Sequence, residues 1–415
     1  MSKLEKLIQQ YCPDGVEYVR LGDVMSIQRG ASPRPIQNYL TDDEYGIPWI
    51  KIGDVSIESK YITSTKERVT KEGAAKSRFL KKGSFILSNS MSFGRPYILE
   101  IDGCIHDGWI SMCDFEKHLL PDFLYYLLRS SVVQDFWISK ANSGGAVTNL
   151  NSDIVRSTLI PVPPLPVQEE VVRVLDTFTE LQAELQAELQ KRKQQYNFYR
   201  DNLLNFKDIN RGGQEIKWMK LKDVATQWYR GAGIKREEVS NEGMPCIRYG
   251  EIHTSYNIWF KDCISHTDET KQATKKYAEY GDILFAITSE DIPLVGNSVA
   301  YLGKEKIMVG GDIVVMKHNQ DPRYMAYALS TSDAIKQKGK GKVKSKVVHT
   351  NVPSLQEIVI PIPPMEEQQR IADILDRFDT LTNDLTSGLP AEMEKRRQQY
   401  EFYRDKLLTF KRKEA

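Results

Sequence analysis

The sequence is poor in the residues that usually build redox or metal centres. Only five of its 415 residues are cysteines, none in a Cys-x-x-Cys pair, and the odd number argues against a closed set of disulfides. The six histidines are scattered without the spacing of metal ligands on a helix. We therefore expect reduced thiols, and neither a metal nor a cofactor on this chain.

Long apolar runs and an excess of one charge are also missing. The longest apolar runs, at 283–287 and 313–316, are far shorter than the ~20 residues of a membrane helix, and residues 1–10 are polar rather than signal-like. These features predict a cytoplasmic protein without a membrane partner. Because 57 basic and 56 acidic residues nearly cancel, any surface that binds nucleic acid must be local.

The common catalytic motifs are absent too. The sequence has no G-x-x-x-x-G-K-[ST], G-x-G-x-x-G, H-E-x-x-H or G-x-S-x-G. Two Pro-Pro pairs precede Leu165 and Met365, where an adenine methyltransferase would carry an aromatic residue. Glu58 and Lys60 have the spacing of a nuclease pair, but such a triplet is common by chance. The chain by itself is therefore not expected to be an enzyme.

What the chain does contain is a duplication. Residues 191–207 and 395–411 are identical at 13 of 17 positions, and a second pair of matching segments precedes them. In that pair, Pro161, Pro163, Pro164, Gln168, Leu175, Asp176, Phe178 and Leu181 recur 200 residues later. A repeat of this length indicates duplicated domains, and such a chain can present two equivalent surfaces to two copies of one partner.

Four segments follow from the repeat. Residues 1–160 mix short strands at 49–52, 85–87 and 109–112 with a helix at 121–140, and residues 209–360 repeat them in outline. Segments 161–208 and 361–415 each begin with prolines and continue as a long helix. The predicted fold class is α+β: two similar mixed α/β domains and a pair of long antiparallel coiled-coil helices, with pseudo-two-fold internal symmetry.

The helix of 161–208 carries an apolar stripe of heptad type. Its members are Val171, Val174, Phe178, Leu181 and Leu185, followed after Leu189 by Tyr196, Tyr199, Leu203 and Phe206. A helix with such a stripe needs a partner, which the second copy supplies. The offset between the copies grows from 200 to 204 residues around Gly388 and Pro390, which predicts a kink or break there.

A run of lysines is the sharpest candidate for DNA contact. Lysine occupies every second position from Lys336 to Lys346, which in an extended chain puts all six on one side, ~6.6 Å apart. Lys340, Lys342, Lys344 and Lys346, with His349 and Thr350 after them, are therefore predicted to contact phosphates and bases. The alternative is a solvated loop.

Other candidate DNA contacts lie at matched places in the two halves. Two loops that combine arginine with glycine contain Arg29 and Arg34 in the first half and Arg230 and Arg236 in the second. Ser143, Thr148 and Asn149 lie in a segment of small polar residues that can donate to phosphates, and Asn89, Arg95 and, in the matching region of the other half, Ser289 are the remaining candidates. An ordinary surface loop would look similar in each case.

The repeated helix ends are candidates for a partner interface. Tyr196, Phe198, Tyr199 and Arg200 have copies in Tyr400, Phe402, Tyr403 and Arg404. The tyrosines on the heptad stripe are predicted to be in the core of the helix pair. Phe198 and Phe402 lie off that stripe and are predicted to face outward as anchors for a partner subunit.

In combination, these motifs resemble the specificity subunit of type I restriction-modification systems. The resemblance rests on the two P-x-P-P-x-x-x-Q segments, the Q-Q-Y-x-F-Y-R-D-x-L-L helix ends, the segment 388–392 and the opening 12–18, and it covers the whole chain. It implies two target recognition domains that read a split, asymmetric DNA sequence, and helices that set the gap.

The resemblance also implies the partners. Two modification subunits would dock on this chain and methylate adenine N6 with S-adenosylmethionine, and restriction subunits would use ATP and Mg. The competing hypotheses are a scaffold that joins two protein-binding domains without DNA, and a specificity module of a fused methyltransferase-nuclease system.

Overall fold

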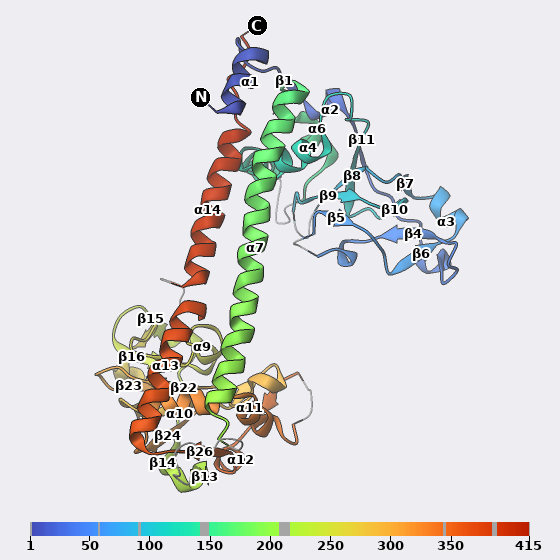
Figure 1. Ribbon diagram of the computed structural model, residues 1–415. Helices are drawn as coiled ribbons and strands as arrows, with labels where there is room; N and C mark the ends of the chain where they lie inside the picture. The colour runs from blue at the N-terminus through green and yellow to red at the C-terminus, as the bar shows by residue number, and fades with distance from the viewer. Residues whose placement is uncertain are drawn as a thin grey trace. The chain divides into compact units, whose positions relative to one another are not determined.

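The computed structural model describes residues 2–56, 59–89, 93–141, 149–206, 216–342, 346–383 and 388–414. Contacts divide the chain into two compact units. Unit 1 contains residues 1–184 and 394–415, and unit 2 contains residues 185–393. Each unit holds one globular α+β part together with part of the long helices (Figure 1). The four predicted segments divide the chain between globular and helical parts, and their boundaries stay predictions.

The globular part of unit 1 contains two five-stranded sheets, ordered β3-β6-β4-β10-β7 and β2-β11-β8-β9-β5. Their strands are β2 Ser26–Arg29, β3 Leu40–Thr41, β4 Ile47–Ile50, β5 Tyr61–Ile62, β6 Glu67–Val69, β7 Arg78–Leu80, β8 Phe85–Ser88, β9 Pro96–Leu99, β10 Gly103–Ile105 and β11 Trp109–Cys113. The strands predicted around 49–52, 85–87 and 109–112 are thus present as β4, β8 and β11.

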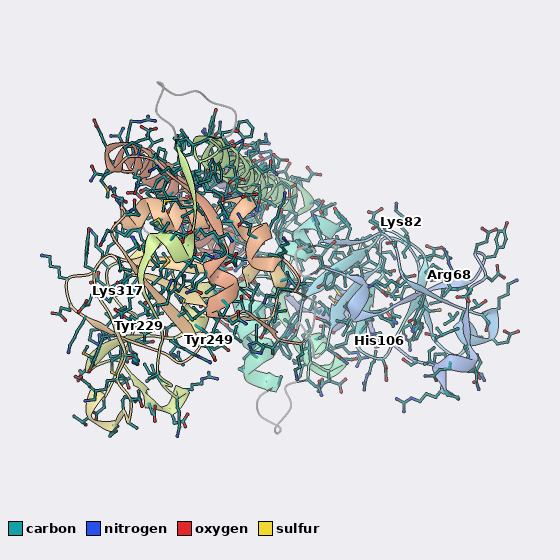
Figure 2. The ribbon with its side chains drawn as sticks, turned by 90° about the horizontal axis from the view of Figure 1, so that it is seen from below. Arg68, Lys82, His106, Tyr229, Tyr249 and Lys317 are labelled. Carbon is teal, nitrogen blue, oxygen red and sulfur yellow. The ribbon has the colours of Figure 1, made fainter. Side chains whose placement is uncertain are left out.

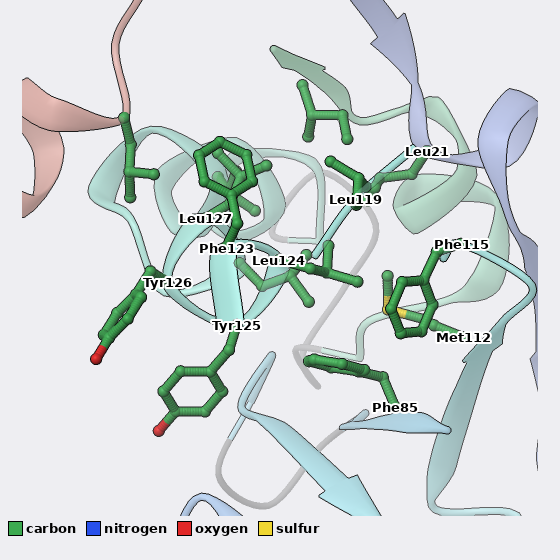
Figure 3. Close-up of a cluster of buried hydrophobic side chains, with 14 of the residues drawn as sticks. Leu21, Phe85, Met112, Phe115, Leu119, Phe123, Leu124, Tyr125, Tyr126 and Leu127 are labelled. Atoms are coloured by element: carbon green, nitrogen blue, oxygen red, sulfur yellow. The ribbon is translucent and has the colours of Figure 1, made fainter. Parts of the chain in front are cut away.

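The described residues of unit 1 also form six short α-helices: α1 Lys3–Tyr11, α2 Leu21–Val24, α3 Lys71–Ala75, α4 Pro121–Leu128, α5 Ser131–Ala141 and α6 Ser152–Ser157. The single helix predicted at 121–140 is wrong, because α4 ends and α5 starts a new helix. The Ser130 hydroxyl donates to the Leu127 carbonyl, and the Ser131 amide donates to Asp405 instead of continuing α4. Figure 3 shows how Phe123, Leu124 and Leu127 of α4 pack over Phe85 and Met112 of the sheet.

Unit 2 repeats this architecture with the same strand order, β14-β24-β20-β22-β17 and β15-β18-β16-β23-β19. Its strands are β14 Ala225–Arg230, β15 Val239–Ser240, β16 Met244–Ile247, β17 Trp259–Phe260, β18 Ser265–Thr267, β19 Tyr277–Ala278, β20 Ile283–Ala286, β22 Ser298–Tyr301, β23 Ile307–Val309 and β24 Ile313–His318. Its helices are α8 Leu221–Val224, α9 Tyr249–Thr254, α10 Pro322–Leu329, α11 Ser332–Gly339 and α12 Val352–Gln356. The equal strand order supports the inferred duplication.

The part of the chain that the structure describes also contains three short two-stranded sheets. β1 (Tyr18–Arg20) pairs with β12 (Leu159–Pro161), and β13 (Lys217–Lys220) pairs with β26 (Val359–Ile362). Each pair places the start of a globular part beside the proline segment that leads out of it. The third sheet, β21 (Thr288–Ser289) with β25 (Val348–His349), belongs to unit 2.

The long helices are α7 Leu165–Leu203, α13 Met365–Asn383 and α14 Leu389–Leu407. Gly388, directly before α14, is not helical, so the predicted interruption is present. Within unit 1 the Tyr403 ring of α14 stacks on Phe178 of α7, and within unit 2 Tyr199 of α7 stacks on Phe378 of α13. Tyr400, one turn before Tyr403, lies beside Thr179, one residue after Phe178. In the same way Tyr196, one turn before Tyr199, lies beside Asp379, one residue after Phe378. The helices therefore run antiparallel within each unit, as predicted.

The predicted apolar stripe is only partly right. Val167, Val171 and Leu175 are fully buried, but in the core of unit 1's globular part, whereas Leu181 is 49% exposed. These three apolar residues, spaced four apart, therefore pack α7 on the globular part of unit 1. The predicted burial of the tyrosines holds for Tyr196, which is 5% exposed, and fails for Tyr199, which is 41% exposed.

Repeated polar residues fasten each helix to its globular part. The Gln168 amide accepts from the Leu120 amide and donates to the Pro163 carbonyl, and Gln368 makes the same pair of contacts with Asp321 and Pro363. Asp176 accepts the Tyr126 hydroxyl at 2.5 Å, and Asp376 accepts the Tyr327 hydroxyl at 2.7 Å. The repeat thus preserves the attachment of helix to domain.

No helix in the described ranges is both long and apolar enough to cross a membrane.

Candidate nucleic-acid interface

A cavity of about 1010 Å³ opens in unit 1 beside the turn that joins β10 to β11. Its lining includes four cations, two carboxylates and four side-chain amides: Arg29, Lys51, Arg78 and Arg156; Asp107 and Asp153; and Gln28, Asn89, Asn149 and Asn151. His106, labelled in Figure 2, lies in the same lining. A hollow with more positive than negative charge concentrates a polyanion, and the amides supply donors and acceptors for base edges.

The repeated Arg-Gly-Ala sequence forms one wall of this cavity. The Gly30 amide donates to the Trp109 carbonyl at 2.8 Å, and a Cβ at Gly30 would lie 2.0 Å from the His106 carbonyl oxygen. Only glycine allows the two backbones to approach so closely. The Arg29 Nε donates to the Asp107 carbonyl at 2.9 Å, which fixes the arginine at the rim while its side chain stays exposed.

Unit 2 builds the same turn from different neighbours. The Gly231 amide donates to the Ile313 carbonyl at 2.9 Å, and a Cβ at Gly231 would lie 2.1 Å from the Gly310 carbonyl oxygen. The Arg230 Nε donates to the Gly311 carbonyl, and its guanidinium pairs with Asp312 at 2.7 Å. The Arg-Gly-Ala repeat is therefore explained by close backbone contact and by an arginine fixed at the rim.

The surroundings of His106 and Asp107 in the unit 1 turn fix the protonation states of these two side chains near neutral pH. Burial lowers the pKa of His106, so its imidazole is neutral, and its Nδ1 accepts from the Gly108 amide at 2.6 Å. Partial burial opposes ionisation of Asp107, but hydrogen bonds from the Ser32 hydroxyl and the backbone, with Arg34 nearby, outweigh it and lower the pKa. Asp107 is therefore an anion that holds the loop of Ser32 and Arg34 against the turn.

The matching region of unit 2 presents other side chains. The His349 Nδ1 lies 3.1 Å from the Thr288 hydroxyl, and the imidazole is exposed. The His253 Nε2 lies 3.0 Å from the Thr288 carbonyl, and because a carbonyl only accepts, this nitrogen carries the proton. Tyr249, labelled in Figure 2, contacts His253 edge-on and is 39% exposed. The two units therefore offer different chemistry at matched places.

Each unit also carries an exposed aromatic patch on its helices. Patch 1 consists of Phe178, Leu181, Phe402 and Tyr403, and patch 2 of Phe378, Leu381, Phe198 and Tyr199. In each patch the outermost ring, Phe402 or Phe198, is more than 60% exposed and packs edge-on against its tyrosine. Both phenylalanines face outward as predicted. Matched apolar surfaces of this kind suit two copies of one partner.

Comparison with known proteins decides the family. The model of the type I restriction modification DNA specificity domain matches residues 13–192 and again residues 214–395. The chain belongs to this family. The specificity subunit of an Escherichia coli type I restriction enzyme is 30% identical over 322 residues, 74% of each chain. That of a second E. coli enzyme, EcoprrI, is 26% identical and covers 93% of this chain and 92% of its own.

The fold agrees with the family. One solved structure superposes on this chain with a TM-score of 0.69 at 17% identity. It comes from work on the structural basis of complex assembly and conformational transition of the type I R-M system. The match covers 95% of this chain and 97% of the other. The predicted α+β class with two similar domains and long helices is confirmed. The chain is a DNA-recognition subunit of a type I restriction-modification system.

The structure brings three of the predicted DNA contacts of this specificity subunit together in the unit 1 cavity: Arg29, Asn89 and Asn149. Arg34 lies beside it, 3.3 Å from Asp107, with a largely exposed side chain. Arg95 is half-buried and interacts with Tyr97, and its contact with DNA stays a prediction. Ser143 and Thr148 lie outside the described residues.

The predicted extended lysine ladder is wrong. Residues Ser332–Gly339 form helix α11, so Lys336 and Lys338 are helical, and Lys338 is buried. The Thr331 side chain caps this helix by accepting from the Ala334 amide, a start signal that the alternation of lysines concealed. Beyond the helix, Lys340 and Lys346 are exposed and Lys342 is half-buried, while Lys344 and Glu58 lie outside the described residues.

Unit 2 differs from the remaining predictions at two further residues. Ser289 and Thr350 are 4% and 7% exposed, and the Ser289 hydroxyl accepts from the Asp291 amide. Both side chains lie beneath the surface, so neither is placed to contact DNA. His349 and Arg236 are exposed, as a contact with DNA requires.

The repeated arginines of the helix ends also lie inward. Arg200 and Arg404 have side chains only 9% and 11% exposed, each over a tyrosine ring and paired with the following aspartate at 2.8 Å. Asp201 then accepts from the Ser332 amide, and Asp405 from the Ser131 amide. The Arg-Asp pair therefore holds the first turn of α11 or α5, and the exposed aromatic residues remain as the candidate partner surface.

Several cavity residues were not predicted, namely Gln28, Lys51, Arg78, His106 and Arg156. They come from segments far apart in the sequence, and only the sheet register brings them together. For Lys51 a signal existed. Lys51 and Arg248 each lie directly before a short helical turn, and the third residue of that turn, Asp54 or Glu251, accepts from their backbone amide. Alignment of the two halves at Gly53 and Gly250 would have found this pair. Among the described residues, no cluster of three or more His, Cys, Asp or Glu could hold a metal ion.

Proposed function

We propose that each unit of this specificity subunit reads one half of a bipartite, asymmetric DNA sequence. The observation that carries the proposal is the shared Arg-Gly-Ala turn with different side chains around it. Lys51, Gln28 and His106 in unit 1 correspond to Arg248, Tyr229 and Gly310 in unit 2, as the matched strand pairs show. One backbone frame with two sets of donors and acceptors recognises two different sequences.

Phosphate contacts would come from the exposed cations around each frame. In unit 1 these are Arg29 and Arg34, and in unit 2 Arg236, Lys340 and Lys346. Their contribution is independent of sequence and weakens with salt.

Binding selection tests this proposal. The chain, purified with its methyltransferase partners, is offered a random duplex library, and bound DNA is sequenced. Two short blocks separated by an unspecified gap of constant length are expected. A single block, or retention without enrichment of any sequence, would contradict the bipartite reading.

The helices would serve as the docking site for two modification subunits, one on each aromatic patch. Support comes from the matched exposure of Phe198 and Phe402 and from the repeat of the surrounding residues. Under this proposal the chain itself is not catalytic and holds no cofactor. S-adenosylmethionine belongs to the modification subunits, and ATP and Mg belong to restriction subunits that join through them.

Truncation of the outermost rings tests docking. Phe198→Ala together with Phe402→Ala should abolish co-purification with the methyltransferase subunit, because exposed aromatic anchors dominate interfaces of this kind. Each single variant should retain one partner instead of two, measured as the mass of the complex by light scattering. Tyr45→Ala is the control, because Tyr45 is a more exposed aromatic residue outside both patches. Unchanged stoichiometry in the double variant would move the interface elsewhere.

A further inference from the structure

Gln28 enters the unit 1 cavity from a rigid backbone position. It lies on β2, where it pairs with Ser111 of β11, and the Ser111 hydroxyl donates to the Gln28 carbonyl at 3.0 Å. Its side chain is exposed and lines the cavity. The backbone is thus held by the sheet while the amide faces the space where DNA would lie.

Arg78 fixes the orientation of this amide from the other sheet. Its strand, β7, pairs with β10, and its Nε donates to the Arg29 carbonyl at 2.8 Å. One terminal nitrogen of the Arg78 guanidinium donates to the Gln28 Oε1. Because a guanidinium has no acceptor, the atom that it contacts must be the amide oxygen. The Gln28 Nε2, with two donor hydrogens, is therefore the end left for a ligand.

This arrangement has a preferred base. Guanine presents two acceptors, N7 and O6, on its major-groove edge, whereas adenine presents one acceptor and the N6 donor. A free glutamine reads adenine with both ends of its amide, but the oxygen of Gln28 is already bonded to Arg78. The bond to Arg78 turns the Gln28 oxygen toward the guanidinium and leaves the Nε2 donor pair facing the cavity, and these donors match acceptors.

Unit 2 lacks this donor pair at the equivalent position. Tyr229, labelled in Figure 2, replaces Gln28, and its hydroxyl donates to the Tyr277 carbonyl of the edge strand β19. Its polar atom is thereby directed to the protein's own backbone. The difference is confined to one pair of matched residues in otherwise equal frames.

We propose that Gln28 reads a guanine in the half-site bound by unit 1, and that Arg78 is the positioning residue that directs the Gln28 amide nitrogen toward the base. This inference rests on the proposed function and adds one base contact to it. It also separates two roles. Gln28 supplies the donors, and Arg78 holds the amide oxygen turned away from the place where it would accept an adenine N6 hydrogen.

Binding selection with the complex of this chain and its methyltransferase partners tests the inference. The wild type should enrich guanine at one position of one block. Gln28→Leu should reduce that preference about 10-fold, within the range for a good base contact, and leave all other positions unchanged. Gln28→Glu is nearly isosteric and keeps an acceptor for Arg78 but removes the two donors, so it should lose the guanine as well.

Arg78→Met gives the signature that a merely structural role would not. Once the amide oxygen is released, the Gln28 amide can turn and pair with adenine as well as donate to guanine. The selected base at the same position should therefore change from guanine alone to guanine or adenine. Tyr229→Phe is the matched control in unit 2 and should leave this position unchanged. Each variant is first checked for cooperative unfolding, and Gln28→Glu stands in if the leucine variant does not fold.

The outcomes separate this inference from the proposed function. Guanine that persists in both Gln28 variants overturns the inference, as does a Gln28-dependent position that selects another base, including A·T pairs read from the minor groove. In either case the bipartite motif of the wild type would still stand. A wild-type complex that enriches no sequence would instead overturn the proposed function itself.

Discussion

Replacing Lys338 with methionine should stabilise unit 2, and the gain should shrink as the pH rises. Lys338 is 5% exposed, and its ammonium has one hydrogen-bond partner in the described residues, the Ser298 hydroxyl at 3.2 Å. The Phe285 ring lies 5.9 Å away. Burial in these surroundings lowers the pKa of Lys338 from 10.5 to about 7.

The pH dependence follows from the direction of this shift. Between pH 7 and about 10.5 the unfolded chain holds a proton on this lysine and the folded chain does not, so stability rises with pH through that window. Well below pH 7 the lysine is charged in both states and the full penalty is present, and at pH 7, where the folded lysine is half protonated, most of it remains. The difference in pKa corresponds to roughly 4 to 5 kcal/mol.

The methionine variant removes this penalty but also the bond to Ser298, worth about 1 kcal/mol. We expect a net gain of about 3 kcal/mol at pH 7, seen as a melting temperature about 6–12 °C higher for the transition of unit 2. At pH 10 the variant and the wild type should melt at nearly the same temperature. Comparing the two proteins at each pH cancels the titration of all other groups.

Lys336→Met is the matched control, because Lys336 lies on the same helix with an exposed side chain. It should change neither the melting temperature nor its pH dependence. A Lys338→Met protein that is less stable than the wild type at pH 7 would show that the amine makes contacts beyond Ser298.

The position in unit 1 that is equivalent to the buried Lys338 of unit 2 holds a tryptophan. Lys338 is the seventh residue of α11 and Trp137 is the seventh residue of α5, and both helices are held at their first residue by an Arg-Asp pair. Trp137 is fully buried and donates to the Thr158 hydroxyl at 2.8 Å. Unit 2 therefore places an aliphatic stem and an amine where unit 1 has an indole, a difference that no pattern of lysines in the sequence reveals.

The duplication made the fold readable from the sequence. Matching segments predicted two similar domains, the long helices and the interruption before Pro390, because these features depend on local propensity and on the comparison of two copies within one chain. The outward orientation of Phe198 and Phe402 followed from helical spacing. These predictions required no knowledge of tertiary contacts.

The cavity could not be predicted in the same way. Arg78 reaches Gln28 only because β7 is the neighbour of β10, and the turn after β10 approaches Arg29. No local pattern encodes such a meeting. The lysine run failed for a related reason, since alternating lysines look like a strand until the cap at Thr331 and the packing of α11 are known. Arg200 and Arg404 misled because charged residues beside exposed aromatics resemble an interface.

The glycines of the two Arg-Gly-Ala turns carry the second large prediction. Gly30→Ala should destabilise unit 1 by about 3 kcal/mol, the upper part of the range for over-packing, and should remove base preference in one half of the target only. The added Cβ would meet the His106 carbonyl oxygen at 2.0 Å, and the opposing atom is backbone on a strand-to-strand turn. That turn also positions Asp107, which holds Arg29 and Arg34, so its displacement disturbs the whole rim.

Gly231→Ala should have the mirror effect, because its Cβ would lie 2.1 Å from the Gly310 carbonyl oxygen. Preference in the other half should then vanish while the first half is read normally. Gly233→Ala, two residues further along, is the matched control, since nothing lies within 4 Å of its Cβ. The measurement is thermal unfolding together with binding selection for each variant. If Gly30→Ala removed preference in both halves, the two units would not read independently, and the division of the target between them would have to be abandoned.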